Sequence, residues 1–159
     1  MALGNTKIIN KTIKSLILGV LILGILQVYN VASAESNSPK TNSQTQVIKN
    51  ITPDEAFVLI EKNKDSSNFV ILDVRTPVEF EDEHIENAIN LNFYSETFKD
   101  NLNKLDKNKI YVSHCQLGGR SVKTVVTMKD LGFVEVYNIT GGIAGWKSKG
   151  LPTNKQKEN

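Results

Sequence analysis

The chain has 159 residues, of which 40% are hydrophobic and 23% charged, which is the composition of a globular protein with room for one domain of usual size. Its 19 lysines and arginines and 17 aspartates and glutamates give a net charge of +2, but three of the lysines lie in the acid-free first 34 residues, so residues 35–159 carry 16 against 17 and a net −1. This balance excludes nucleic-acid binding as the main function, because phosphate binding needs clustered cations, and the single cysteine, Cys115, excludes an intramolecular disulfide, a CxxC redox pair and a multi-cysteine zinc site.

Residues 1–34 have the pattern of an export signal. A lysine-bearing head precedes an unbroken apolar run at 16–26, and Ala32 and Ala34 are small residues of the kind that signal peptidase accepts. We expect cleavage after Ala34. The alternative is an uncleaved membrane anchor, since residues 15–34 approach the ~20 residues that a membrane span needs. Either way, the rest of the chain is expected outside the cytoplasm, in the periplasm or held at the membrane.

Polar composition marks the limits of the folded part. Residues 35–46 contain no apolar side chain and predict a disordered linker, because nothing in them offsets the entropy lost on ordering. The domain is expected at 47–151, and residues 152–159 as a polar tail. About 105 residues can build one hydrophobic core but not two.

Within 47–151, apolar runs of strand length alternate with helical patterns, which predicts an α/β fold with a parallel sheet covered by helices. Strands are predicted at 69–74, 88–91, 110–114 and 134–139, with a short edge strand at 47–48.

Helices are predicted between these strands. The clearest begins after Thr52, where Pro53 suits the first helical position and Glu55 completes a capping box. Another follows Arg120, with Val122, Val125 and Val126 on its core face and Gly132 as its stop. Shorter helices are predicted at 77–83, 95–105 and 142–149.

The segment from Cys115 to Ser121 concentrates the chemistry. It lies between a buried strand and a helix start, at the edge of the sheet where open α/β folds place their sites. Gly118 and Gly119 allow a sharp turn whose amide groups point inward, and Arg120 adds a cation. Such a cradle stabilises an anion and lowers the pKa of a thiol. The alternative is a buried cysteine that acts only as a small apolar residue.

Five sequence pieces resemble the single-domain rhodaneses, a family of sulfurtransferases. They are DVRTPVEF at 73–80, HIENAIN at 84–90, YVSHCQLGGRS at 111–121, LGF at 131–133 and GGIAGW at 141–146. The resemblance implies a rhodanese-like α/β fold with a five-stranded parallel sheet flanked by helices on both faces. It also implies that Cys115 carries a sulfane sulfur as a persulfide, without cofactor or metal. The loop residues that would hold this sulfur are Gln116, Leu117, Gly118, Gly119, Arg120 and Ser121.

Loop length separates two chemistries. Protein phosphatases and arsenate reductases use Cys-x5-Arg, a loop sized for a tetrahedral oxyanion, whereas the count here is Cys-x4-Arg. The shorter loop favours a bound sulfur, although His114 before Cys115 is also found in phosphatases. A third hypothesis is a persulfide carrier or binding module that turns over only with a partner protein.

Other residues are expected to support the loop. Arg75 is predicted to pair with Asp73, Glu79 or Glu83, and the acidic run at 79–86 is predicted to be a solvated helix face rather than a metal site. His84 is expected to make a structural hydrogen bond. Glu83 and Asn87 stand where the family commonly has glycines, which leaves the turn geometry there open. Trp146 fits either core packing or the mouth of the site. His114 is expected to point away from Cys115, because successive strand residues alternate faces.

The loop also limits which substrates can approach. Gln116 and Leu117 carry no charge, so an anionic donor such as thiosulfate would meet only Arg120, with Lys123 or Lys147 nearby. The expected partners are small donors such as thiosulfate, polysulfide or a persulfide, and acceptors such as cyanide, a small thiol or a protein thiol.

Overall fold

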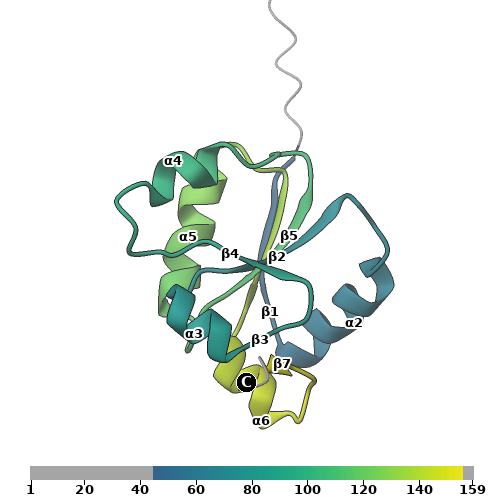
Figure 1. Cartoon of the computed structure of the whole chain (residues 1–159). Helices are drawn as coiled ribbons and strands as arrows, with labels where there is room; N and C mark the ends of the chain where they lie inside the picture. The colour runs from purple at the N-terminus through teal and green to yellow at the C-terminus, as the bar shows by residue number, and fades with distance from the viewer. Residues whose placement is uncertain (1–44, 156–159) are drawn as a thin grey trace, which may run out of the picture. The chain divides into compact units, whose positions relative to one another are not determined.

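The computed structural model describes residues 45–155 (Figure 1). The predicted export signal or anchor at 1–34 and most of the predicted linker lie outside these residues, as does the end of the predicted tail. No helix within 45–155 combines the length and the apolar character that crossing a bilayer requires.

The described chain forms one central sheet with helices on both sides (Figure 1). The strands are β1 (Val47–Ile51), β2 (Phe69–Asp73), β3 (Glu83–His84), β4 (Ala88–Asn90), β5 (Ile110–His114), β6 (Glu135–Ile139) and β7 (Asn154–Lys155). The helices are α2 (Pro53–Asn63), α3 (Pro77–Asp82), α4 (Phe98–Asn103), α5 (Gly119–Asp130) and α6 (Gly142–Ser148). Five strands pair in parallel in the order β1-β6-β5-β2-β4, which confirms the predicted five-stranded sheet.

The predicted strands agree with the observed ones to within a few residues. The edge strand differs most, since the sequence predicts only 47–48 and β1 extends to Ile51. Its polar residues Lys49 and Asn50 stand opposite Tyr137 and Asn138 of β6. Pairing with a neighbour therefore sets the length of this strand, and its own apolar pattern does not.

Two helices begin with the same capping box. At α2, as predicted, the Thr52 side chain accepts from the amide of Glu55, while Glu55 Oε2 accepts from Thr52 N at 2.7 Å. At α3, Thr76 and Glu79 repeat the arrangement, with Thr76 N donating to Glu79 Oε2 at 2.9 Å. Each box satisfies amide groups that a helix start leaves without partners.

The buried face of α5 differs from the prediction. Val122 and Val126 are 46% and 55% exposed, and Val125 is the only one of the three valines in the core. The buried residues are Ser121, Thr124, Val125 and Met128. Apolar spacing misses this face because Ser121 and Thr124 bury their hydroxyls by donating to backbone carbonyls one turn earlier, at 3.1 Å and 3.0 Å.

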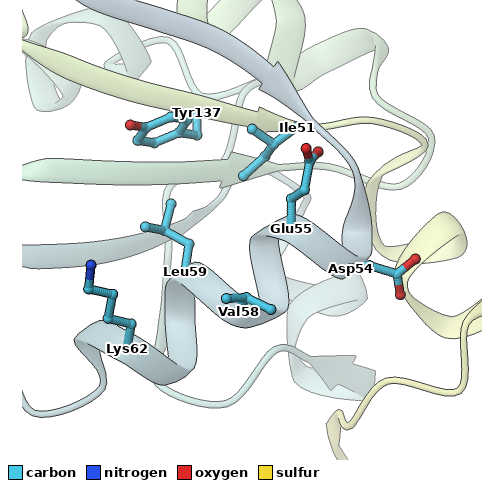
Figure 2. A pocket seen from close by; sticks show the side chains of 7 residues that line it. All are labelled: Ile51, Asp54, Glu55, Val58, Leu59, Lys62 and Tyr137. Atoms are coloured by element: carbon cyan, nitrogen blue, oxygen red, sulfur yellow. The ribbon is translucent and has the colours of Figure 1, made fainter.

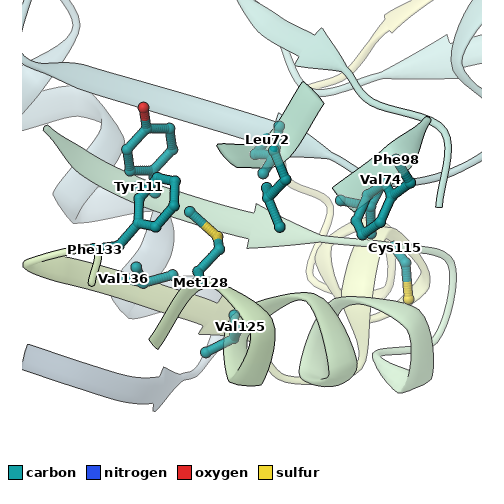
Figure 3. Close-up of a cluster of buried hydrophobic side chains, with 10 residues drawn as sticks. Leu72, Val74, Phe98, Tyr111, Cys115, Val125, Met128, Phe133 and Val136 are labelled. Atoms are coloured by element: carbon teal, nitrogen blue, oxygen red, sulfur yellow. The ribbon is translucent and has the colours of Figure 1, made fainter. Parts of the chain in front are cut away.

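The core has two halves, one on each side of the sheet. On the α4 and α5 side, Tyr111 and Phe133 meet edge to face at 5.2 Å beside Met128 and Leu72, and Figure 3 shows Cys115 at the end of this cluster beside the first turn of α5. On the α2 and α6 side the buried residues include Ala56, Ile60, Ile71, Val112, Ile139 and Trp146. Because residues of both halves alternate along β2 and β5, each strand anchors helices on both faces.

The described chain contacts the domain beyond both of the limits set by composition. Gln46 Nε2 donates to the carbonyls of Lys129 and Phe133 at 2.9 Å and 2.8 Å. After Leu151, Thr153 Oγ1 donates to Glu83 Oε1 at 2.6 Å, and β7 pairs antiparallel with β3. These contacts are polar, so the apolar pattern of the sequence does not predict them.

Candidate active site

Cys115 directly follows β5, so the sheet places it at the carboxyl edge, between the strand and the start of α5. Its side chain is buried, with the residue only 2% exposed. The sulfur nevertheless faces polar groups, because the amide of Gly118 donates to Sγ at 3.1 Å and the Ser121 hydroxyl lies 3.7 Å from it. The thiol therefore lies at the end of the apolar cluster with its sulfur facing hydrogen-bond donors.

These donors control the ionisation of the thiol. Burial raises the pKa of Cys115. Hydrogen bonds from the amide and hydroxyl of Ser121 and from the amides of Gly118 and Leu117 lower the pKa by more than burial raises it. The net pKa lies below the ordinary value for a cysteine. A thiolate, which is the nucleophilic form of cysteine, is thus favoured at this position.

Helix α6 orients the loop from the other side. Ile143 N donates to the Cys115 carbonyl at 2.8 Å, and Ala144 N donates to the Gln116 carbonyl at 3.1 Å. Because the carbonyl and amide of a trans peptide point in opposite directions, holding these carbonyls on α6 turns the following amides toward the sulfur.

Two glycines are required by this arrangement. Gly142 has φ +59°, and a Cβ there would lie 2.3 Å from the Cys115 carbonyl oxygen. Gly118, in the loop itself, has φ +102°, a conformation that other residues rarely adopt. Only glycine lets the first turn of α6 approach the loop backbone this closely.

Arg120 is paired with Glu79, which the sequence does not predict. Its two terminal nitrogens donate to Glu79 Oε1 and Oε2 at 2.7 Å and 2.8 Å, and its guanidinium lies 5.6 Å from the centre of the Tyr94 ring. The hydrogen bonds from Arg120 outweigh burial and, with those from Thr76, hold the pKa of Glu79 down to about 2. No local pattern reveals this pair, because the two residues are 41 positions apart.

Asp73 and Arg75 form a buried ion pair at the end of β2. Arg75 Nη2 lies 2.7 Å from Asp73 Oδ2, and both side chains are almost fully buried. Arg75 also donates to the carbonyl of Glu83, and its Nη1 reaches Gln116 Oε1 at 3.5 Å. The pair thereby connects the end of β2 to a loop residue next to Cys115.

His114 and His84 both have structural surroundings. The buried His114 has Nε2 3.7 Å from Asp73 Oδ2, and neither ring nitrogen has a hydrogen-bond partner among the described residues. Burial lowers its pKa more than Asp73 raises it. His84 is bonded through Nδ1 to the Phe80 carbonyl at 2.8 Å and stacks on the Phe80 ring.

The acidic run is not a solvated face throughout. Glu79 is half-buried and paired with Arg120, and Glu83 is buried, where it binds Lys147 and Thr153. The prediction is wrong for these two residues because their partners come from distant segments. Of the three cations expected near the loop, Arg120 and Lys147 are therefore neutralised. Trp146 is 1% exposed and donates to the Pro152 carbonyl at 2.9 Å, as a packed core residue.

A hollow of about 490 Å³ lies between α2 and the sheet (Figure 2), lined by Ile51, Asp54, Glu55, Val58, Leu59, Lys62 and Tyr137. It is mainly apolar, and Cys115 is not among the residues that line it. Among residues 45–155, no three His, Cys, Asp or Glu side chains are grouped as metal ligands would be. The chemistry of the described chain therefore centres on the Cys115 loop.

Comparisons with known proteins agree on one family. A sequence model of the rhodanese-like domain matches residues 52–149. The thiosulfate sulfurtransferase GlpE of Coxiella burnetii (strain RSA 493 / Nine Mile phase I) is 33% identical over 111 residues, covering 70% of this chain and 97% of that protein. The chloroplastic thiosulfate sulfurtransferase 16 of Arabidopsis thaliana is 36% identical over 92 residues, covering 52% of this chain and 77% of that protein.

Solved structures show the same fold. A rhodanese-like domain protein from Staphylococcus aureus superposes with a TM-score of 0.53 at 38% identity, covering 65% of this chain and 96% of that one. A rhodanese-related protein from Thermoplasma volcanium gives a TM-score of 0.57 at 26% identity, covering 68% and 99%.

Proposed function

The chain belongs to the rhodanese-like domain family, and we propose that it is a sulfurtransferase that carries sulfane sulfur on Cys115 as a persulfide. The observation that carries the proposal is the cradle around Sγ, in which the Gly118 amide and the Ser121 hydroxyl face the sulfur. The relatives named thiosulfate sulfurtransferase support the same class of reaction.

In the first half-reaction, the Cys115 thiolate attacks the outer sulfur of a donor. With thiosulfate, a bond forms between Sγ and the outer sulfur, the sulfur–sulfur bond of the donor breaks, and sulfite leaves with the electron pair. The product is Cys115–S–S⁻. Inward amides of the loop stabilise the charge on its terminal sulfur, as an oxyanion hole does for oxygen.

In the second half-reaction, an acceptor attacks the terminal sulfur and Cys115 leaves as a thiolate. Cyanide gives thiocyanate, and a small thiol or a protein thiol gives a new persulfide. Because the sulfur rests on the enzyme between the two steps, double-displacement kinetics are expected. The reaction in this form uses no cofactor or metal.

Mass spectrometry of the intact protein tests this function. After exposure to thiosulfate or polysulfide, the wild type should gain the mass of one sulfur atom on Cys115, and added cyanide should remove it as thiocyanate. Cys115→Ser should do neither. A wild-type protein that gains no sulfur from either donor would falsify the proposal.

Two other results would favour the competing functions. Turnover of a phosphate ester or arsenate that depends on Cys115 would favour a phosphatase or arsenate reductase. Loading that cyanide cannot discharge would favour a persulfide carrier that needs a partner protein.

We also propose that the domain acts outside the cytoplasm, in the periplasm or at the membrane. The support is the lysine head, apolar run and small residues before Ala34. The mass of the protein purified from its own cells tests it, because cleavage after Ala34 leaves a chain that begins at Glu35. A full-length chain recovered from the cytoplasm would contradict export.

A further inference from the structure

Arg120 is the only charged residue in the segment from Cys115 to Ser121. An anionic donor that approaches the thiolate is repelled by it, so the charge state of this segment decides which donors react. Arg120 directly precedes Ser121, whose hydroxyl lies 3.7 Å from Sγ, so the cation and the sulfur belong to the same turn of the loop. The Glu79 hydrogen bonds raise the pKa of Arg120.

Glu79 holds this cation firmly. The pair is bidentate, at 2.7 Å and 2.8 Å, which is the strongest geometry between arginine and a carboxylate. Glu79 is itself fixed, because Oε2 also accepts from the amide and the hydroxyl of Thr76 at 2.9 Å and 2.8 Å. Tyr94 covers the guanidinium from a third side.

Two of the neighbouring cations are occupied as well. Arg75 pairs with Asp73, and Lys147 pairs with Glu83. Three apolar or aromatic side chains near the ion pair and the loop are exposed, Val78, Tyr94 and Leu117, at 77%, 68% and 74%. The polar Gln116 is exposed beside them. Of the cations named above, Lys123 alone is left for a doubly charged donor, whereas an organic donor meets apolar surface.

We propose that Glu79 is a specificity-determining residue, which keeps Arg120 from dianions such as thiosulfate and so favours a hydropersulfide carried by an organic thiol. This deepens the sulfurtransferase function proposed above and rests on it. In the favoured step, the Cys115 thiolate attacks the outer sulfur of R–S–SH, the bond between the two donor sulfurs breaks, and R–S⁻ leaves with the electron pair. The proton stays on the outer sulfur and the product is Cys115–S–SH.

The test compares two donors in single-turnover loading of the full chain, followed by mass spectrometry. Thiosulfate is the dianion, and benzyl hydropersulfide is the organic donor. Glu79→Gln removes the charge but can still complete the capping box, which accepts glutamine. We expect this variant to load from thiosulfate roughly tenfold faster than wild type. A tenfold change in rate corresponds to the electrostatic effect that shifts a pKa by about one unit. Loading from benzyl hydropersulfide should change by less than about twofold, because the form that reacts, R–S–SH, is neutral.

A matched control is built into the chain. Glu55 occupies the same position in the capping box of α2 but pairs there only with Thr52. Glu55→Gln should leave both loading rates unchanged. Adding Arg120→Gln to Glu79→Gln should abolish the gain with thiosulfate, and added salt should reduce it.

The outcomes distinguish the two proposals. If wild type loads sulfur but Glu79→Gln has the same donor preference, the role of Glu79 is wrong and the sulfurtransferase stands. If the gain persists without Arg120, the role of Glu79 is also wrong, because the freed cation is its stated cause. If Cys115 loads from neither donor, both proposals are overturned.

Discussion

Single residues decide how reactive the Cys115 thiol is. Ser121 is fully buried, and its single hydroxyl proton has two acceptors in reach, Sγ at 3.7 Å and the Gly118 carbonyl oxygen at 3.1 Å. The amide and hydroxyl of Ser121 are also the largest of the effects that lower the pKa of the thiol. Ser121, in the first turn of α5, therefore lowers the pKa of the nucleophilic thiol.

Ser121→Ala should raise the pKa of Cys115, because it removes one donor to the thiolate and leaves burial unchanged. The pH profile of alkylation by iodoacetamide should move to higher pH. At pH 7 the loading rate should fall by about three- to tenfold, the range expected for losing one ordinary hydrogen bond.

Thr124→Val is the control for Ser121→Ala, since it removes an equally buried hydroxyl from the same helix face. Thr124 donates to the Arg120 carbonyl and not to the sulfur. The alkylation profile should stay in place. An unchanged profile in Ser121→Ala would show that the backbone amides alone set the ionisation of the thiol.

His114 makes stability depend on pH. Burial lowers its pKa from an ordinary 6.5, with Asp73 opposing the effect, so below this value the unfolded chain binds a proton that the folded chain does not. The free energy of unfolding should be constant above pH 6.5 and fall below it, by up to about 1.4 kcal/mol per pH unit.

Urea unfolding between pH 5 and pH 7 measures this dependence, above the ordinary value of 4.5 below which the lowered pKa of Glu79 also makes stability depend on pH. His114→Phe should remove the slope, and because neither ring nitrogen has a hydrogen-bond partner, it also removes two unsatisfied buried atoms. His84→Gln should keep the slope. A slope that survives in His114→Phe would assign the acid sensitivity to another group.

Among single residues, site residues that are adjacent in sequence could be predicted, and ion pairs between residues far apart in sequence could not. The Cys115 loop is predictable because its glycines, Arg120 and Ser121 adjoin the cysteine in sequence. The pairing of Arg120 with Glu79 depends on how α3 packs against the start of α5, and no periodicity contains that information. The only local signal is the Thr76-Pro77-Val78-Glu79 capping box, which matches the one at Thr52.

The helices and strands that could be predicted are those with a clear apolar or capping pattern in their own sequence. β2, β5 and β6 are apolar runs that the sequence shows directly, and the α2 capping box marks its helix start. β3 and β7 have two residues each and exist only because they pair with one another, so no local pattern could reveal them.

The contact between α6 and the Cys115 loop gives a prediction at the scale of elements. In Gly142→Ala the added Cβ would lie 2.3 Å from the Cys115 carbonyl oxygen, so the loop or the helix must move. We expect the free energy of unfolding to fall by about 2–4 kcal/mol, from overpacking combined with a positive φ. Sulfur loading should be nearly abolished, because the amides would no longer face the sulfur.

Gly150→Ala isolates the clash from the backbone strain. Gly150 has φ +67°, close to the +59° of Gly142, but an added Cβ would meet nothing within 4 Å. This variant should lose about 1 kcal/mol and keep its loading rate. Equal losses of loading rate in Gly142→Ala and Gly150→Ala would mean that the close approach of α6 does not position the loop.

Over the whole domain, the site is assembled from segments that the sheet brings together. β5 lies in the middle of the sheet between β6 and β2, so the loop after β5 is within reach of the segments that leave these two neighbouring strands. β6 leads into α6, which binds the loop carbonyls, and β2 leads into Arg75 and α3, which supply contacts to Gln116 and Arg120. Strand order therefore determines which distant residues surround Cys115.

The C-terminal segment is a further part of this assembly, beyond the boundary at Leu151 that composition suggests. Pro152 supplies the acceptor for Trp146, and Thr153 binds the buried Glu83. Ending the chain after Leu151 leaves these two buried polar groups without those partners, which should lower the free energy of unfolding by about 2 kcal/mol or more. Ending it after Lys155 preserves both contacts and the pairing of β7 with β3, so it should change little. Urea unfolding of the two shortened chains beside the full chain measures the difference. Equal stability of all three would mean that the fold is complete at Leu151 and that water satisfies Trp146 and Glu83 equally well.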